Sequence, residues 1–333
     1  MRTGIIDADL LDNGTRHPNL ALMKISAFKK EQGNKVELVN DYNHVSDYDE
    51  IYISKVFSKT SIPIRLDNPK IKYGGTGFFY DKAPDLPDEI EHHMPDYGLY
   101  NSYIQTSIDK GANISHFSDY LFYSIGFSTR GCFRKCSFCV NRKYDKSFKH
   151  SPIAEFFDHT RKYIYLWDDN FFSFCGWEQI IDELQEVNRP FQFRQGLDIR
   201  LLDKRKAMRL SQSNYHGDVI FAFDVLADEE VVRKGLNIWK DISIKSTKLY
   251  LLCAYESTDI EDIYGLFHRI RILMRYGCLP YVMRYDNWRY SKYAGMYITI
   301  ARWCNQPAIF KKMSFRQFVE ANGSTSSAMR YFR

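Results

Sequence analysis

The sequence predicts an α/β fold with parallel sheets, and two observations lead to this class. Within the first hundred or so residues, short apolar segments alternate with a helical segment, which is typical of a parallel sheet. From residue 120 onward, six apolar runs recur at a spacing of roughly thirty residues, which fits successive βα units. We therefore expect a partial (β/α)6 TIM barrel preceded by a small Rossmann-like α/β domain.

The chain of 333 residues is expected to have three parts: a Rossmann-like domain over 1–115, a partial barrel over 116–305 and a helical tail over 306–333. Apolar residues make up 44% of it, enough for one large core or two smaller ones. The net charge of +5 is small for a dedicated nucleic-acid binder, so a nucleic-acid partner is not expected.

The first domain is expected to contain three strands and one long helix. The strands are predicted over Gly4–Ala8, Val36–Val39 and Ile51–Ser54, and the helix over Pro18–Gln32, where apolar residues share one face. The glycine-rich stretch Lys72–Gly77 is expected to be a tight turn. The aspartates near the N-terminus do not fit a signal peptide, and the chain lacks an apolar run of about eighteen residues, so no membrane segment is expected.

The barrel is expected to be built from the six apolar runs. Its strands are predicted over Leu121–Phe127, Tyr163–Trp167, Phe191–Phe193, Val219–Phe223, Leu249–Ala254 and Pro280–Met283. One helix is expected to begin with a capping box over Thr258–Glu261 and to end at Gly277. The tail is expected to be a terminal helix with a basic face.

A cysteine motif directly follows the first barrel strand. Cys132, Cys136 and Cys139 have the spacing C-x3-C-x2-C. Three ligands are one too few for a closed zinc site, but they suit a [4Fe–4S] cluster with one iron left open. The other four of the seven cysteines are scattered, and an odd count argues for reduced thiols and a cytoplasmic location.

The stretch Ser128–Cys139, with the aromatic Phe138 before its last cysteine, resembles the cluster-binding loop of the radical SAM superfamily. The resemblance extends over about Tyr120 to Trp303. It implies a [4Fe–4S] cluster held by the three cysteines and S-adenosylmethionine (SAM) bound at the open iron. It also implies an external low-potential electron donor, such as flavodoxin or ferredoxin, and a 5′-deoxyadenosyl radical that abstracts hydrogen from a substrate.

In this family the remaining site residues lie at the carboxyl ends of the barrel strands. For SAM, the resemblance assigns the amino group to Asp168 and Asp169, the carboxylate to Arg200 with Arg194 in reserve, the ribose to Asp224, and the adenine side to Phe138 and Glu256. Substrate contacts are predicted for Gln195, Asp198, Arg284 and Asp286. A helix N-cap for the Asp-Asp-Asn motif and surface ion pairs for the charged residues remain open as alternatives.

The first domain resembles the cobalamin-binding domains that often precede radical SAM barrels. It departs from them in the Asp-x-His-x-x-Gly motif, because Asp9–Gly14 has no histidine. We therefore expect this fold without cobalamin.

The substrate is expected to be a small molecule, because the chain has no room for a separate RNA-binding domain. In the segments Ile5–Gly14, Gln195–Arg200 and Asn305–Pro307 the chain resembles an anaerobe-type radical SAM group. Within this group its length and layout resemble those of queuine lyases, which release a preQ1-type base from the 7-deazaguanine base queuine by cleaving a carbon–nitrogen bond. One alternative is a radical SAM enzyme that modifies RNA or a peptide. Another is a zinc-binding nucleic-acid module with His150 as the fourth ligand.

Overall fold

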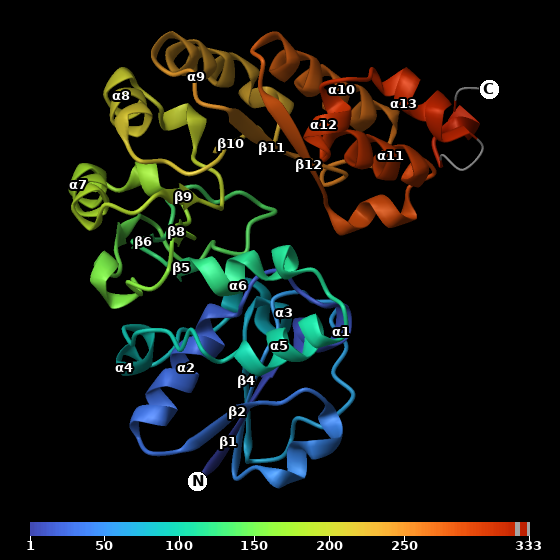
Figure 1. The fold of residues 1–333 in the computed structure, drawn as a ribbon. Coiled ribbons are helices and arrows are strands. Elements are labelled where there is room, and N and C mark those ends of the chain that lie inside the picture. The colour runs from blue at the N-terminus through green and yellow to red at the C-terminus, as the bar shows by residue number, and fades with distance from the viewer. Residues whose placement is uncertain (324–326, 332–333) are drawn as a thin grey trace. The chain divides into compact units, whose positions relative to one another are not determined.

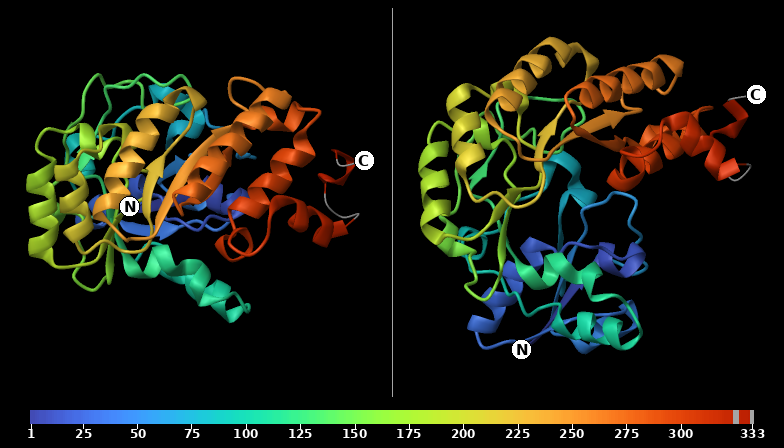
Figure 2. Two further views of the ribbon diagram at one scale, coloured as in Figure 1. Left: turned by 90° about the horizontal axis from the view of Figure 1, so that it is seen from above. Right: turned by 45° about the horizontal axis from the view of Figure 1, so that its top comes forward.

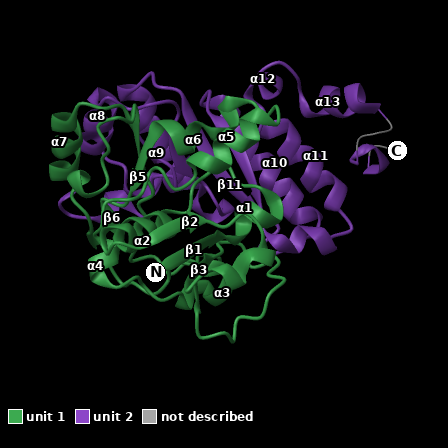
Figure 3. Cartoon of the chain, turned by 60° about the horizontal axis from the view of Figure 1, so that its bottom comes forward, with its two compact units in different colours: residues 1–169, 178–191 green, residues 170–177, 192–333 purple. Residues whose placement is uncertain are grey.

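The structure, a computed structural model, describes residues 1–323 and 327–331 (Figure 1). The chain divides into two compact units, coloured separately in Figure 3. The first unit comprises Met1–Asp169 and Glu178–Phe191, and the second comprises Asn170–Trp177 and Gln192–Arg333. These units do not test the expected boundaries near residues 115 and 305, which stay a prediction. Residues 324–326 and 332–333 of the expected tail lie outside the described residues.

The first unit begins with a parallel four-stranded sheet in the order β2-β1-β3-β4. Its strands are β1 (Arg2–Asp7), β2 (Lys35–Leu38), β3 (Glu50–Ser54) and β4 (Ile71–Gly74). Neighbouring residues of β1 pack into different hydrophobic clusters, because successive side chains of a strand point to opposite faces. Ile5 packs with Leu22 of α2 (Leu20–Glu31), whereas Ile6 packs with Ile53. The expected parallel sheet is confirmed.

The fourth strand of this sheet was not expected from the sequence, and the glycine turn lies later than expected. Strand β4 occupies part of the stretch that was expected to be a turn, and the turn itself begins at Gly75. Gly75 has a φ of 102°, and a Cβ there would lie 2.3 Å from the carbonyl oxygen of Lys55, so only glycine fits. Further helices of this unit are α1 (Ala8–Asn13), α3 (Thr76–Phe79), α4 (Asp88–Glu91), α5 (Asn101–Asp109) and α6 (Ser118–Phe122).

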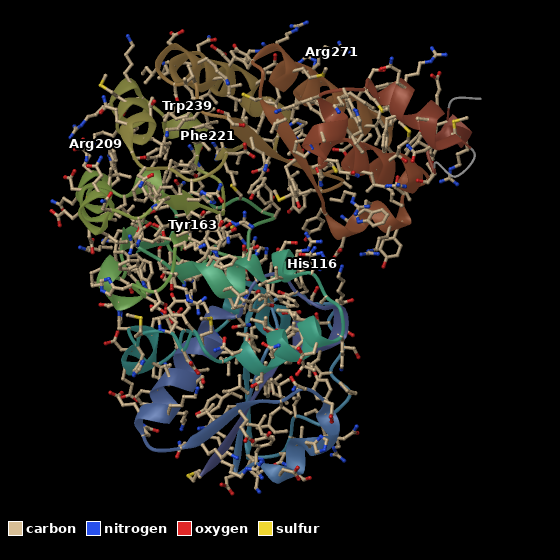
Figure 4. All side chains as sticks on the ribbon, viewed as in Figure 1. His116, Tyr163, Arg209, Phe221, Trp239 and Arg271 are labelled. Carbon is tan, nitrogen blue, oxygen red and sulfur yellow. The ribbon has the colours of Figure 1, made fainter. Side chains whose placement is uncertain are left out.

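The rest of the first unit carries the start of the predicted barrel. Strands β5 (Tyr123–Gly126) and β8 (Tyr163–Leu166) pair in parallel, and β9 (Phe191–Phe193) is next in the order of this sheet. The rings of Tyr123 and Tyr163, which start these two strands, lie 4.9 Å apart, and Tyr163 is labelled in Figure 4. Two short strands, β6 (Thr129–Arg130) and β7 (Phe148–Lys149), form an antiparallel pair, and α7 spans Trp177–Val187.

The second unit contains a parallel three-stranded sheet in the order β10-β11-β12. Its strands are β10 (Val219–Ala222), β11 (Thr247–Cys253) and β12 (Leu279–Arg284). Its helices are α8 (Lys204–Gln212), α9 (Glu229–Ile242), α10 (Ile260–Arg275), α11 (Ala294–Cys304), α12 (Pro307–Phe310) and α13 (Phe315–Asn322). Helix α10 contacts β11 and β12, and α11 contacts β12 (Figure 2). Phe221 of β10 packs on Trp239 of α9 with ring centroids 5.6 Å apart (Figure 4).

All six predicted barrel strands are present within about two residues of their expected ends, but their arrangement differs from the expectation. They form two sheets of three, and no closed barrel is seen in the described part of the chain. The expected capping box is wrong, because α10 starts after Asp259, whose side chain makes no cap hydrogen bond. Within its described residues, the tail contains two short α-helices, α12 and α13, in place of the one expected. Among the described residues, no helix is both long and apolar enough to cross a bilayer.

Candidate functional site

The three cysteines of the motif lie in a loop that we call the cysteine hairpin, residues 129–149. The hairpin is closed at its base by the β6–β7 pair, in which Thr129 is opposite Lys149 and Arg130 is opposite Phe148. Gly131 turns the chain into the loop with a φ of 86°, and a Cβ there would lie 2.3 Å from the carbonyl oxygen of Lys146. The sequence therefore places glycine where the two arms of the hairpin come too close for any side chain.

Backbone amides already face two of the thiols. The sulfur of Cys132 accepts a hydrogen bond from the Arg134 amide, and that of Cys139 accepts one from the Asn141 amide, each at 3.3 Å. A turn links the Cys139 amide to the Cys136 carbonyl oxygen at 3.0 Å. Burial raises the pKa of Cys139, and the negative charges of Asp169, Cys136 and Cys132 raise it further. A positively charged group bound between the thiols would relieve this repulsion.

This donor set fits an iron–sulfur cluster better than a single metal ion. Within residues 1–323 and 327–331, no three Cys, His, Asp or Glu side chains are placed to hold one ion. In a [4Fe–4S] cluster each cysteine binds a different iron, so the sulfurs surround a volume and need not meet at a point. The zinc alternative is not supported, because the ring nitrogens of His150 face Ser151 at 3.0 Å and Glu91 at 3.3 Å.

Asp168, which follows β8, fixes the start of the cysteine hairpin. Its carboxylate accepts hydrogen bonds from the backbone amides of Ser128 and Thr129 at 2.8 and 2.9 Å, and from both of their hydroxyls. Burial raises the pKa of Asp168 to about 6, although these hydrogen bonds act in the opposite direction. At neutral pH the group is therefore mostly ionised and holds four donors.

Asp169 binds the two arms of the same hairpin. Its carboxylate accepts a hydrogen bond from the Gly131 amide at 2.7 Å and one from the side-chain amide of Asn141 at 2.6 Å. The guanidinium of Arg130 lies 3.4 Å away. This contact between the aspartates and the hairpin was not expected from the sequence. Their role in binding the SAM amino group stays a prediction, and the structure shows their oxygens engaged with hairpin donors.

In the second unit, the predicted carboxylate-binding arginine is held in an ion-pair network. The Arg200 guanidinium donates to Asp198 at 2.7 and 3.2 Å and to Asp228 at 2.7 Å. These carboxylates raise the pKa of Arg200. Asn170 also donates to Asp198, at 3.3 Å. The Arg200–Asp198 contact is an ion pair, but it is not the surface ion pair expected as the alternative, because the Asp198 side chain is only 7% exposed. The roles of both residues toward SAM and substrate stay predictions.

Asp224, expected to contact ribose, follows β10 beside the buried guanidinium of Arg269. That guanidinium donates to the carbonyl oxygens of Phe223, Asp224 and Leu252, at 2.9, 2.6 and 2.8 Å. The Oδ1 atom of Asp224 is buried and has no hydrogen-bond partner among the described residues. Burial raises the pKa of Asp224 to about 6. The nearby charges of Arg269 and Arg200 act in the opposite direction, but the oxygen itself is a buried acceptor without a hydrogen bond in the described structure.

The remaining predicted residues of the second unit lie at or just beyond the carboxyl ends of its strands. Ala254, after β11, has a φ of 60°, and its amide donates to Asp262 at 2.9 Å. Such a strained backbone is held only where surrounding contacts fix it. Gln195, Glu256, Arg284 and Asp286 are exposed, and Phe138 of the first unit is half-buried with its carbonyl oxygen 3.4 Å from the Tyr80 hydroxyl.

Fold and site together describe an α/β protein with parallel sheets and a cysteine hairpin beyond one of their strands. The chain is similar to a solved structure of TsrM, a radical S-adenosylmethionine methyltransferase from Kitasatospora setae, with cobalamin and a [4Fe–4S] cluster bound. The TM-score is 0.54 at 11% identity, covering 85% of this chain and 72% of that one.

A weaker similarity is to SuiB from Streptococcus suis, with a TM-score of 0.37 at 12% identity, covering 62% of this chain and 57% of that one. SuiB has also been solved bound to its precursor peptide SuiA. No protein-family model and no curated protein matches the sequence.

Proposed function

We propose that this protein is a radical SAM enzyme. The observation that carries the proposal is the cysteine hairpin, in which three half-buried thiols lie on a loop closed by β6 and β7. Cys132, Cys136 and Cys139 would hold a [4Fe–4S] cluster. When bound, such a cluster supplies the electron that cleaves SAM reductively. The similarity in fold to TsrM supports the same class.

The strand order supports the proposal that the two three-stranded sheets belong to a partial (β/α)6 barrel. Leu197, shortly after β9, forms an isolated parallel bridge with Phe221 of β10, and its amide donates to Ile220 at 2.8 Å. For SAM, Asp224 is the strongest candidate, because its buried Oδ1 is an acceptor without a partner in the described structure. Glu256 and Phe138 remain candidates for the adenine side, and Arg200 would need to leave Asp198 to bind a carboxylate.

The N-terminal sheet is proposed to have a cobalamin-domain-like fold that does not bind cobalamin. The segment Asp9–Gly14, where the histidine motif would lie, is used differently here. Asp9 accepts hydrogen bonds from the Val56 amide at 2.6 Å and from the Thr60 hydroxyl. The carboxylate of Asp9 thus stabilises the loop that follows β3.

The proposed reaction acts on a small molecule in a reducing, cytoplasmic setting, with electrons from a low-potential donor such as flavodoxin or ferredoxin. Queuine is the specific substrate that the sequence resemblance suggests, and the reaction would release a preQ1-type base. RNA or a peptide remains the alternative substrate.

Anaerobic incubation of the iron-loaded protein with SAM and a reductant tests the proposal. We expect methionine and 5′-deoxyadenosine, formed faster with the true substrate from a panel of queuine, short RNAs and peptides. Cys136→Ala should abolish both products, whereas the matched variant Cys175→Ala, outside the hairpin, should retain them. Absence of 5′-deoxyadenosine from the iron-loaded wild-type protein would refute the proposal.

A further inference from the structure

The segment that follows β12 combines aromatic rings with unbalanced positive charge. It consists of the 3₁₀ turn η8 (Asp286–Tyr290) and the residues on either side of it. The guanidinium carbon of Arg284 lies 4.3 Å from the ring centroid of Trp288, and that of Arg289 lies 4.9 Å from the same centroid. The indole of Trp288 therefore contacts two guanidinium groups. Single cation–π pairs on protein surfaces are common, but two on one ring bring like charges together.

Acidic side chains do little to offset these two charges. Arg284 has no carboxylate within ion-pair distance among the described residues, and Arg289 has only Asp286, at 3.9 Å, whose side chain is 62% exposed. Burial lowers the pKa of Arg284, and the neighbouring charge of Arg289 lowers it further. Two like-charged guanidinium groups near one ring favour the binding of an anion.

The turn is held in place before any ligand arrives. The Tyr285 amide donates to the Cys253 carbonyl oxygen at 2.9 Å, and the Ser291 hydroxyl donates to the Thr258 carbonyl oxygen at 2.6 Å. The first contact connects the turn to the last residue of β11, and the second connects it to the loop that follows β11. A site that is already ordered loses less entropy when it binds.

Flat rings accompany the charges. Tyr290, beside Arg289, is 90% exposed, and Tyr285 packs edge-on against Tyr255 with ring centroids 4.7 Å apart. The segment also lies beyond the carboxyl end of a parallel strand, where α/β sheets bind their ligands. Exposed aromatic faces beside arginines suit a ligand that carries both a planar heterocycle and a negative charge.

We propose that Arg284, Trp288 and Arg289 form a recognition site for a nucleotide. Its phosphate would bind the two guanidinium groups, and its heterocycle would stack on the aromatic side chains of the turn. The inference rests on the proposed function in one respect: it takes the substrate of the proposed enzyme to be phosphate-bearing, which favours a nucleotide over the free base queuine. A free mononucleotide and a nucleotide within an RNA chain share this chemistry.

Calorimetry on the full-length protein tests the site with guanosine 5′-monophosphate, guanosine, a short single-stranded RNA and an acidic peptide as probes. We expect the monophosphate to bind at least about tenfold more tightly than guanosine. Arg284→Gln and Arg289→Gln should each weaken its binding about fivefold or more. Arg316→Gln, a change of an exposed arginine on α13, should leave it unchanged. If RNA binds much more tightly than the monophosphate, the natural ligand is a nucleotide within an RNA strand. If the two bind equally, the natural ligand is a free nucleotide.

The proposal is overturned if the monophosphate and guanosine bind equally, if Arg284→Gln and Arg289→Gln both retain wild-type affinity, or if the acidic peptide binds best. The test of nucleotide binding is independent of the test of the proposed function. Iron content and SAM cleavage of the wild-type protein are measured without a nucleotide. Their absence would refute the radical SAM assignment while leaving nucleotide binding to stand or fall on its own.

Discussion

Replacement of Asp168 by alanine is expected to loosen the cysteine hairpin and to destabilise the protein. The change removes the acceptor for four donors of Ser128 and Thr129. The two hydroxyls can turn to other partners, but the two buried amides are left without one, at a cost of about 1–3 kcal/mol each. We therefore expect a loss of about 2–5 kcal/mol in the free energy of unfolding.

Urea unfolding of the wild type and the variant, at neutral pH where the carboxylate is mostly ionised, measures this loss. Asp168→Asn keeps one acceptor oxygen and should lose about half as much as alanine. Asp88→Ala, a change at a side chain that is 97% exposed, serves as the control and should cost less than about 0.5 kcal/mol. The reasoning is refuted if Asp168→Ala and Asp88→Ala unfold at the same urea concentration and take up the same amount of iron.

Three further predictions concern other buried groups. Burial raises the pKa of Asp7 from 3.8 to about 6, so the folded state binds its proton more tightly; the contribution of Asp7 to stability should be greatest below about pH 4 and fall by about 3 kcal/mol as the pH rises through 6, and in urea titrations across that range Asp7→Asn should lose that much less stability than the wild type, whereas equal slopes would contradict the reasoning. Arg269→Met leaves three carbonyl oxygens without their donor and should cost about 3–5 kcal/mol in the same assay; a loss below about 1 kcal/mol would contradict the reasoning. Gly131→Ala should lower iron uptake and cost more stability than Gly33→Ala, because both glycines have positive φ but only the first faces a backbone oxygen; equal losses would show that the close approach does not matter.

Most of the strands could be predicted because they are runs of apolar residues that the structure buries; β2, which has no buried residue, is an exception. Strand β9 was placed at its observed ends, and all three of its residues are buried. The missed elements lack this signal. Strand β4 is an edge strand in which only Ile71 is buried, and α5 buries only Ile104, so neither has an apolar pattern that distinguishes it from a loop.

The cysteine motif could be predicted because its chemistry is local in the sequence. The contacts that hold it could not. Ser128 and Asp168 are 40 residues apart, and nothing in either segment specifies that one binds the other. The same holds for Arg200, whose partner Asp228 lies 28 residues further along the chain. A charged residue at a strand end can bind a ligand or a neighbouring side chain, and only the fold decides between them.

Metal analysis of the reconstituted protein tests the central claim most directly. Anaerobic reconstitution with iron and sulfide should give a brown protein with about four iron and four sulfide ions per chain, and addition of SAM should change the electron paramagnetic resonance spectrum of the reduced protein. Cys136→Ala should lose most of the iron. A colourless protein that retains a single zinc ion, or a spectrum that SAM leaves unchanged, would contradict the account.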